Sequence, residues 1–171
     1  MSTDPGLIHQ YEQLHEAGHF LGLSLLPHVK RITQLVEEHK PQSILDYGCG
    51  KATQYFDKRA HDAWRIMPRL YDPAVPDFRI KPQGVYDGVI CTDVLEHVPE
   101  EHVESTLAEI FKFAGQFIFL SICTRAAKKK LPDGRNVHLT IRPAAWWMEK
   151  INTAKANAPR FVHVEVAWHD D

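Results

Sequence analysis

The sequence lacks the features that mark disulfide scaffolds, zinc ribbons and membrane proteins. Only three of its 171 residues are cysteines, and Cys49, Cys91 and Cys123 lie in or beside apolar runs, at no disulfide or zinc spacing. No apolar stretch approaches the roughly 20 residues that span a bilayer, and residues 1–6 lack the basic and apolar regions of a signal peptide. We therefore expect reduced thiols, no membrane partner and a cytoplasmic location.

The chain also lacks a charge excess and internal repeats. Twenty Lys and Arg against 22 Asp and Glu leave a formal net charge of -2, so general nucleic-acid binding is not expected. No low-complexity tract separates domains, and 44% hydrophobic residues suffice for a core. The sequence predicts one domain over residues 1–171, with an N-terminal helical segment or lid over 1–40 and an α/β core over 41–171.

Short apolar runs alternate with helical patterns along the chain. We expect strands over 43–47, 69–72, 84–92 and 116–123, and helices within 7–40 and over 52–63, 100–113 and 143–151. Continuous apolar strands between helices are typical of a parallel sheet covered on both faces. The predicted fold class is therefore α/β, with a doubly wound, mostly parallel sheet. The alternating segment 161–168 is expected at a sheet edge, with an antiparallel direction left open.

A glycine-rich turn follows the first expected strand, in the run Ser43-Ile-Leu-Asp-Tyr-Gly-Cys-Gly-Lys-Ala52. In an open α/β sheet, glycines at this place let the backbone approach a ligand, and the following helix offers free N–H groups. A nicotinamide-dinucleotide fingerprint would need Gly-x-Gly-x-x-Gly, but position 53 is Thr. The turn therefore favours a different ligand.

The turn resembles the first motif of the class I S-adenosylmethionine-dependent methyltransferases, which is a hydrophobic strand, an acid, and Gly-x-Gly with a third small residue. The matching residues are Ile44, Leu45, Asp46, Gly48, Gly50 and Ala52. The resemblance implies that Gly48 and Gly50 line the methionine portion of the cofactor, and that Asp46 orients the loop or holds the ammonium group. Ala52 replaces a usual glycine, which is tolerable at a negative φ.

The same resemblance implies an acid at the end of the second strand that accepts hydrogen bonds from both ribose hydroxyls. Asp72, in Leu70-Tyr-Asp-Pro73, is the candidate, although Asp before Pro is also a common turn former. The cofactor-binding set implied is Asp46, Gly48, Cys49, Gly50, Asp72, Pro73, Thr92 and Asp93. A helix and a strand usual in the family are missing between Asp72 and Tyr86, so we expect a reduced sheet and an altered adenine contact.

The segment from Tyr86 to Val98 is similar to the fourth-strand region of the family's small-molecule branch. Asp93, Glu96 and His97 lie at i, i+3 and i+4, so a helical turn beginning near Asp93 would project them to one side. The pattern resembles that of ubiquinone-pathway catechol O-methyltransferases and small-RNA terminal 2′-O-methyltransferases. It implies a magnesium or other divalent cation on these three residues, which would lower the pKa of an acceptor hydroxyl. Alternatively, the three residues form a helix-start cap and a general base.

A histidine and a group of cations follow the last core strand. His138 is a candidate fourth ligand, second base or substrate contact, unless it is simply an exposed loop residue. A basic loop would hold an anionic part of the substrate, unless it is only a solvated face. Its members are Arg125, Lys128, Lys129, Lys130 and Arg135.

Two aromatic groups are candidates for covering the site. Trp146 and Trp147 would point about 100° apart on a helix, so we expect one in the core and the other over the substrate pocket. The N-terminal residues Tyr11, His15 and Phe20 either form a lid or only pack.

Together these features predict an enzyme that transfers the methyl group of S-adenosylmethionine to an oxygen or nitrogen of a small or nucleotide-like acceptor, mainly by positioning. The catalytic candidates are Asp93, Glu96, His97 and His138. Two alternatives stay open. One is an RNA- or nucleotide-modifying methyltransferase, which the basic loop supports, and the other is a cofactor-binding or partner-binding module without turnover.

Overall fold

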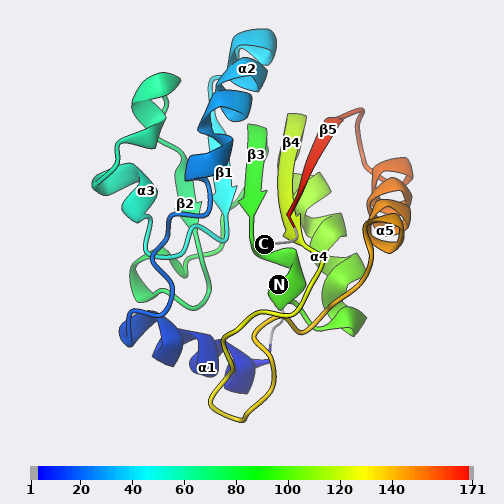
Figure 1. Ribbon diagram of the computed structural model, residues 1–171. Coiled ribbons are helices and arrows are strands. Elements are labelled where there is room, and N and C mark those ends of the chain that lie inside the picture. The colour runs from blue at the N-terminus through cyan, green and yellow to red at the C-terminus, as the bar shows by residue number, and fades with distance from the viewer. Residues whose placement is uncertain (1–3, 170–171) are drawn as a thin grey trace.

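Five parallel strands form the central sheet, in the order β2-β1-β3-β4-β5 (Figure 1). The computed structural model describes residues 4–169; residues 1–3 and 170–171, which the domain prediction included, lie outside the described residues. The strands are β1 (Ile44–Tyr47), β2 (Arg69–Tyr71), β3 (Tyr86–Thr92), β4 (Ala114–Cys123) and β5 (His163–His169). The predicted α/β class with a parallel sheet is confirmed.

Helices cover both faces of this sheet. The α-helices are α1 (Pro5–Glu16), α2 (Val29–His39), α3 (Thr53–Phe56), α4 (Glu100–Phe113) and α5 (Ala144–Ala156), and the 3-10 turns are η1 (Leu26–His28), η2 (Ala60–Ala63), η3 (Pro76–Phe78) and η4 (Leu95–His97). Along β3, Val89 and Cys91 pack with α4 and α5, whereas Ile90 packs with α2 and α3. Because both faces are buried, the strands are apolar at successive positions. Within residues 4–169, no helix combines the length and apolarity needed to cross a membrane.

The antiparallel direction that the sequence left open for the last strand is not the one observed. β5 lies at the sheet edge, as expected, but it pairs in parallel with β4, from Phe117 opposite His163 to Cys123 opposite His169. The connection includes α5, which carries the chain back along the sheet so that β5 starts at the same end as β4. The carboxyl end of β5 therefore joins those of the other strands.

Two expected helices are shorter than the sequence patterns indicate. The segment 52–63 contains only α3 and η2, because Arg59 adopts a left-handed conformation with φ 53° between them. Within residues 7–40, α1 ends at Glu16 and α2 begins only at Val29. Gly18 and Gly22, both with positive φ, lie in the segment that joins them. This leaves residues 17–25 as an irregular strap.

The connection between β2 and β3 is as short as the sequence indicates. Its only regular element is η3, and the loop is closed by a hydrogen bond of 3.0 Å from the backbone N–H of Asp72 to the carbonyl of Phe78. No helix and strand separate β2 from β3 in the described chain, so β2 is the edge of the sheet.

Candidate active site

The carboxyl ends of the strands open into a cavity of about 790 Å³. Its opposite wall consists of α1 and the loop over 123–138, which lie below the strand ends in Figure 1. Ligand sites of roughly 300–1,000 Å³ are usual in proteins, and open α/β sheets bind ligands at this edge. The cavity is therefore large enough for a cofactor together with a small acceptor.

The glycine turn is anchored to the end of the neighbouring strand β2. The backbone N–H groups of Gly48 and Cys49 donate to the carbonyl of Tyr71 at 2.7 and 3.1 Å. Asp72 Oδ2 accepts a hydrogen bond of 2.9 Å from the N–H of Gly50, and its Oδ1 accepts one of 2.9 Å from Ala74. Burial raises the pKa of the Asp72 carboxyl, and the nearby His15 opposes this. The two predicted cofactor elements therefore lie in contact with each other.

Most of the implied cofactor residues face the cavity. Lining it are Gly48, Cys49, Gly50, Asp72, Pro73, Thr92 and Asp93. Asp46 is not among the lining residues. Its Oδ2 accepts hydrogen bonds from Tyr55 Oη at 2.8 Å and Gln54 Nε2 at 3.1 Å, so it joins β1 to α3. Of the two roles that the resemblance implied, this geometry favours orienting the loop.

Ala52 differs from the sequence expectation, because its φ is 55° rather than negative. The residue is fully buried and forms the N-cap position of α3, where the chain must reverse direction after the glycine turn. A left-handed conformation costs an alanine roughly 1–2 kcal/mol. The turn therefore holds strained backbone next to the cavity.

The strap over residues 17–25 crosses directly over this turn, a contact that sequence reasoning missed. The backbone N–H of Gln54 donates to the carbonyl of Gly22 at 2.9 Å. A Cβ placed on Gly22 would lie 3.2 Å from the backbone nitrogen of Ala52 and 3.3 Å from those of Lys51 and Thr53. Any other residue would have to adopt the left-handed conformation at φ 66° and push the strap away from the turn by a few tenths of an ångström. A glycine isolated between two helical patterns was the available signal.

We expect Gly22→Ala to destabilise the protein by about 2–3 kcal/mol, since it combines left-handed strain with a tight contact of the added methyl group against backbone nitrogens. Gly18→Ala is the matched control, because Gly18 also has a positive φ but no atom within 4 Å of the added Cβ. It should cost only about 1 kcal/mol. Urea unfolding of both variants measures the difference. Equal losses would show that the close approach at Gly22 does not matter.

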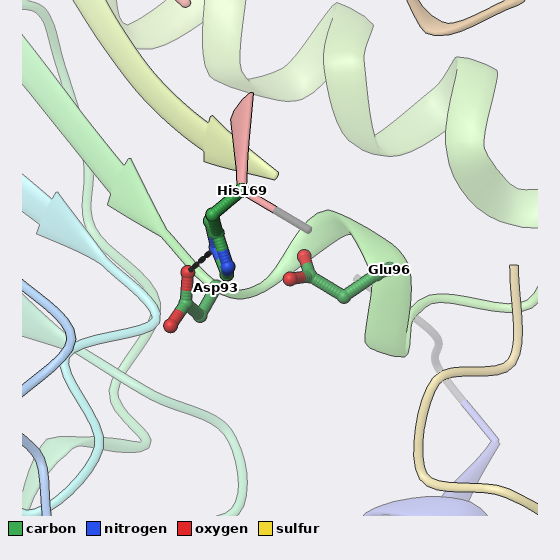
Figure 2. Close-up of side chains that lie close together, drawn as sticks. All are labelled: Asp93, Glu96 and His169. Carbon is green, nitrogen blue, oxygen red and sulfur yellow. Dashed lines mark hydrogen bonds and ion pairs between the residues drawn. The ribbon is translucent and has the colours of Figure 1, made fainter. Parts of the chain in front are cut away.

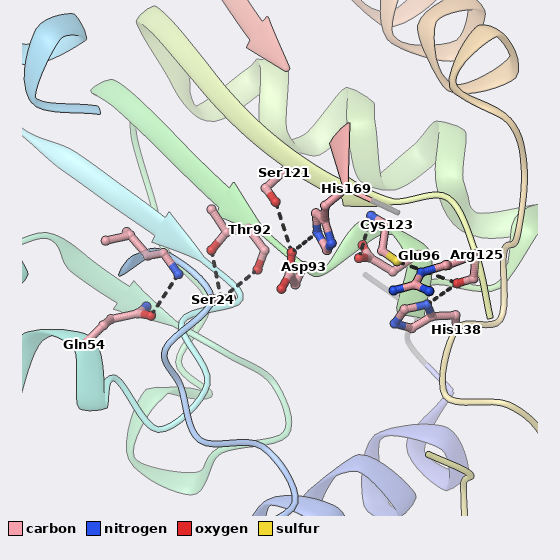
Figure 3. A network of polar contacts seen from close by, with 11 residues as sticks. Ser24, Gln54, Thr92, Asp93, Glu96, Ser121, Cys123, Arg125, His138 and His169 are labelled. Carbon is pink, nitrogen blue, oxygen red and sulfur yellow. Dashed lines mark hydrogen bonds and ion pairs between the residues drawn. The ribbon is translucent and has the colours of Figure 1, made fainter. Parts of the chain in front are cut away.

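Asp93 and Glu96 occupy the wall of the cavity beyond β3. Asp93 Oδ1 accepts hydrogen bonds from Ser121 Oγ at 3.0 Å and His169 Nε2 at 2.7 Å (Figure 3). Burial raises the pKa of the Asp93 carboxyl, but the bonds and charge from His169 and Ser121 outweigh it and leave the pKa below its usual value. Glu96 Oε1 accepts from the N–H of Cys123 at 2.9 Å, and burial raises the pKa of Glu96 to about 8.

His169 is the site residue that sequence reasoning missed. One of its ring nitrogens, a carboxylate oxygen of Asp93 and one of Glu96 all lie within 4.8 Å of one another (Figure 2). The expected strand stopped at residue 168, and its direction was open. Had β5 been taken as parallel, a histidine at its carboxyl end would have been a candidate for the same edge of the sheet.

The structure does not bring His97 into this group, which corrects the ligand set Asp93, Glu96 and His97. The cause is the local backbone. Asp93 has φ 56°, and residues 95–97 form the 3-10 turn η4 rather than an α-helical turn. Asp93 therefore lies outside the turn, and no single helix places residues 93, 96 and 97 on one face. Glu96 lies in the group with Asp93, whereas the His97 ring packs on Tyr11 of α1.

His97 and His138 form a second pair in the cavity wall. His97 Nδ1 lies 2.9 Å from the carbonyl of Val137, and His138 Nδ1 lies 2.6 Å from that of Arg125. A carbonyl only accepts, so each Nδ1 carries the hydrogen and each Nε2 holds a lone pair. The rings meet edge to face, with centroids 4.9 Å apart. Burial lowers the pKa of His97 to about 4 and also lowers the pKa of His138, so both rings are neutral.

The three N-terminal candidates all line the cavity. Tyr11 Oη donates to the carbonyls of Val137 at 2.7 Å and His97 at 3.1 Å, and Phe20 packs edge to face on His97. His15 lies over the glycine turn, since its Cε1 would be 3.5 Å from a Cβ on Gly50. These contacts make α1 part of the cavity wall, as a lid requires.

The basic loop divides into two parts. Arg125, Lys128 and Lys129 line the cavity. Arg135 instead forms an ion pair of 2.7 Å with Asp133, and Lys130 pairs with Asn136 in an isolated bridge. Neither of these two lines the cavity, which corrects the expectation of a single five-residue cluster.

The tryptophan pair is placed away from the site. Trp147 is fully buried in the core, as expected for one of the two. Trp146 does not line the cavity; it is half-buried against the core and packs beside the cations Arg142 and Lys150. The expectation that it covers the substrate pocket is wrong, because α5 covers a face of the sheet rather than the carboxyl ends of its strands.

A parallel sheet with a glycine turn after β1, an acid after β2 and a cavity at their ends is typical of a Rossmann-like fold that binds a nucleoside-containing cofactor. The chain matches the family model described as a methyltransferase domain over residues 18–160, and it belongs to that family. It is a class I S-adenosylmethionine-dependent methyltransferase, as the sequence predicted. Comparison with curated proteins and with solved structures gave no significant match.

Proposed function

We propose that this enzyme methylates an oxygen or nitrogen of a small or nucleotide-like acceptor bound beside Asp93, Glu96, His97 and His138. One observation carries the proposal. The same cavity is lined by the glycine turn and Asp72 on one side and by these polar side chains on the other. A methyl donor at the turn and an acceptor at the carboxylates and histidines would then be held together, which is the main requirement of methyl transfer.

The glycine turn and Asp72 suit S-adenosylmethionine. Gly48 and Gly50 have positive φ and no side chain, so their backbone can approach a ligand closely. Each oxygen of Asp72 accepts one backbone hydrogen bond, and a carboxylate oxygen can accept two, so each can also accept from a ribose hydroxyl. The cofactor supplies a methyl group on a positively charged sulfur. The protein supplies position and the removal of the acceptor proton.

His97 and His138 can accept that proton. Their Nδ1 hydrogens are fixed on the carbonyls of Val137 and Arg125, so each Nε2 is a neutral base. His97 is the more firmly held, because Tyr11 and Phe20 pack on its ring. We assign His97 as the general base and His138 as a substrate contact.

The test of the proposal is calorimetric titration with S-adenosylmethionine, followed by incubation with phenols, alcohols, amines and nucleotides. Mass spectrometry should detect the gain of one methyl group on at least one acceptor class. Binding of the cofactor together with a methylated product supports the proposal. No heat of binding at millimolar cofactor contradicts it.

His97→Gln should lower kcat by about 100-fold, because glutamine keeps the size of the side chain but cannot accept the proton. Affinity for S-adenosylhomocysteine should not change, since the His97 side chain contacts Tyr11, His138 and Val137 rather than the glycine turn. His9→Ala, an exposed change on α1, is the control and should leave kcat unaltered. Unchanged turnover in His97→Gln would remove His97 from the role of base.

The cations in the cavity wall favour an anionic acceptor within this class. Arg125, Lys128 and Lys129 could face a phosphate or carboxylate, which makes a nucleotide the second candidate acceptor. The KM of a nucleotide acceptor should then rise with salt, while the KM of a neutral acceptor stays constant. A nucleotide KM that is independent of salt would contradict this candidate.

A further inference from the structure

Three potential metal ligands converge on the cavity wall from different parts of the chain. Asp93 follows β3, Glu96 lies in η4, and His169 ends β5. One donor atom from each lies within 4.8 Å of the other two. In Figure 2, the Glu96 carboxylate points toward Asp93 and His169.

Glu96 provides an independent sign that this group takes a ligand. The residue is 0% exposed and lines the cavity, and its Oε2 has no hydrogen-bond partner among the described residues. A buried carboxylate oxygen without a partner is costly, since it has lost its water and gained nothing in return. A cation bound beside it would remove that cost.

The carboxylates are also held in place from behind. Ser121 Oγ donates to Asp93, and the backbone N–H of Cys123 donates to the other oxygen of Glu96. Such outer hydrogen bonds are typical of metal ligands, because they fix the orientation of the donor atoms before the ion binds. Both supporting residues belong to β4, which lies between β3, the strand before Asp93, and β5, which ends at His169.

We propose that Asp93, Glu96 and His169 bind a divalent first-row transition-metal ion, such as Mn²⁺. Magnesium and calcium prefer oxygen ligands alone, whereas an imidazole nitrogen with two carboxylates suits manganese, iron or zinc. The His169 nitrogen that faces the two carboxylates becomes a ligand through its lone pair, and the ring hydrogen then resides on the other nitrogen. In the proposed function, on which this role rests, the ion would supply positive charge next to the acceptor oxygen or nitrogen.

Binding is tested on the full chain with Mn²⁺ alone, without cofactor or acceptor. The electron paramagnetic resonance signal of free Mn²⁺ should fall with a stoichiometry of one ion per chain. His169→Ala should weaken the affinity at least about tenfold, and Glu96→Gln should do the same. His163→Ala, at the opposite end of β5, is the matched control and should bind as the wild type does. Circular dichroism checks that each variant is folded.

The outcomes separate this site from other possibilities. No binding at 1 mM Mn²⁺, on the order of the weakest metal sites in proteins, contradicts the proposal. Binding that survives His169→Ala but is lost in His97→Gln would move the ion to the ligand set predicted from the sequence, and so also contradicts it. Because cofactor binding is measured separately by calorimetry, failure of the metal site is distinct from failure of the proposed function.

Discussion

Replacing Asp72 with alanine should weaken the binding of S-adenosylhomocysteine by about 1,000-fold. Hydrogen bonds to a charged group contribute roughly 1.5–3 kcal/mol each, and two lost ribose contacts together amount to about 3–6 kcal/mol. Each 1.4 kcal/mol corresponds to about a tenfold change in affinity. The substitution also removes the bond of 2.9 Å that Asp72 accepts from Gly50, so the turn loses an anchor. Isothermal calorimetry measures the affinity.

Two further variants test whether the loss of affinity comes from the Asp72 carboxylate itself. Asp72→Asn keeps one acceptor oxygen and should lose less affinity than the alanine variant, which also provides a test if Asp72→Ala fails to fold. Asp77→Ala changes an exposed acid in the same connection and should bind as the wild type does. Retention of full affinity in Asp72→Ala would exclude Asp72 from the cofactor site.

The glycine turn and Asp72 could be predicted from the sequence, because patterns of a few neighbouring residues determine where they lie. Gly48 and Gly50 punctuate an apolar strand, and Asp72 ends the next one, so a parallel sheet necessarily brings them to one edge. The continuous apolar character of β3 and β4 likewise indicated strands buried on both faces. The match over residues 18–160 bears out the family that these features indicated.

The residues that sequence reasoning misplaced depend on backbone geometry that no spacing reveals. His97 leaves the ligand group because η4 is a 3-10 turn, and that conformation follows the left-handed φ of Asp93. His169 joins the group only because β5 is parallel, which depends on how α5 carries the chain back. A spacing of i, i+3 and i+4 specifies a common face only if one α-helix contains all three residues, and here Asp93 lies outside η4.

The contact between the N-terminal strap and the glycine turn was missed for a related reason. The strap over residues 17–25 has no periodic pattern, yet Gly22 lies against the glycine turn more than 25 positions later in the chain. This contact joins two turns whose backbones are both left-handed at the point of contact, at Gly22 with φ 66° and at Ala52 with φ 55°. Local patterns describe each turn separately. Only the folded chain shows that the turn at Gly22 packs against the turn after β1.

Asp46→Asn should stabilise the protein at pH 8 by up to about 4 kcal/mol. Burial raises the pKa of Asp46 from 3.8 to about 7, although its bonds from Tyr55 and Gln54 oppose the rise. Between these pH values the unfolded chain releases the Asp46 proton and the folded protein retains it. The free energy of unfolding is therefore highest, as far as Asp46 is concerned, below pH 3.8. It falls as the pH rises, and the contribution of Asp46 is fully lost above about pH 7. A difference of about three pKa units corresponds to about 4 kcal/mol, and asparagine avoids the loss because it does not ionise.

Urea unfolding at pH 5 and pH 8 measures this effect. The advantage of Asp46→Asn should be large at pH 8 and much smaller at pH 5, where folded Asp46 is protonated. The amide oxygen can still accept from Tyr55 and Gln54, so the link between β1 and α3 persists. Asp57→Asn, an exposed change just after α3, should leave stability unchanged at both pH values. A variant at position 46 that is less stable than the wild type at pH 8 would mean that the ionised carboxylate itself holds the glycine turn in place.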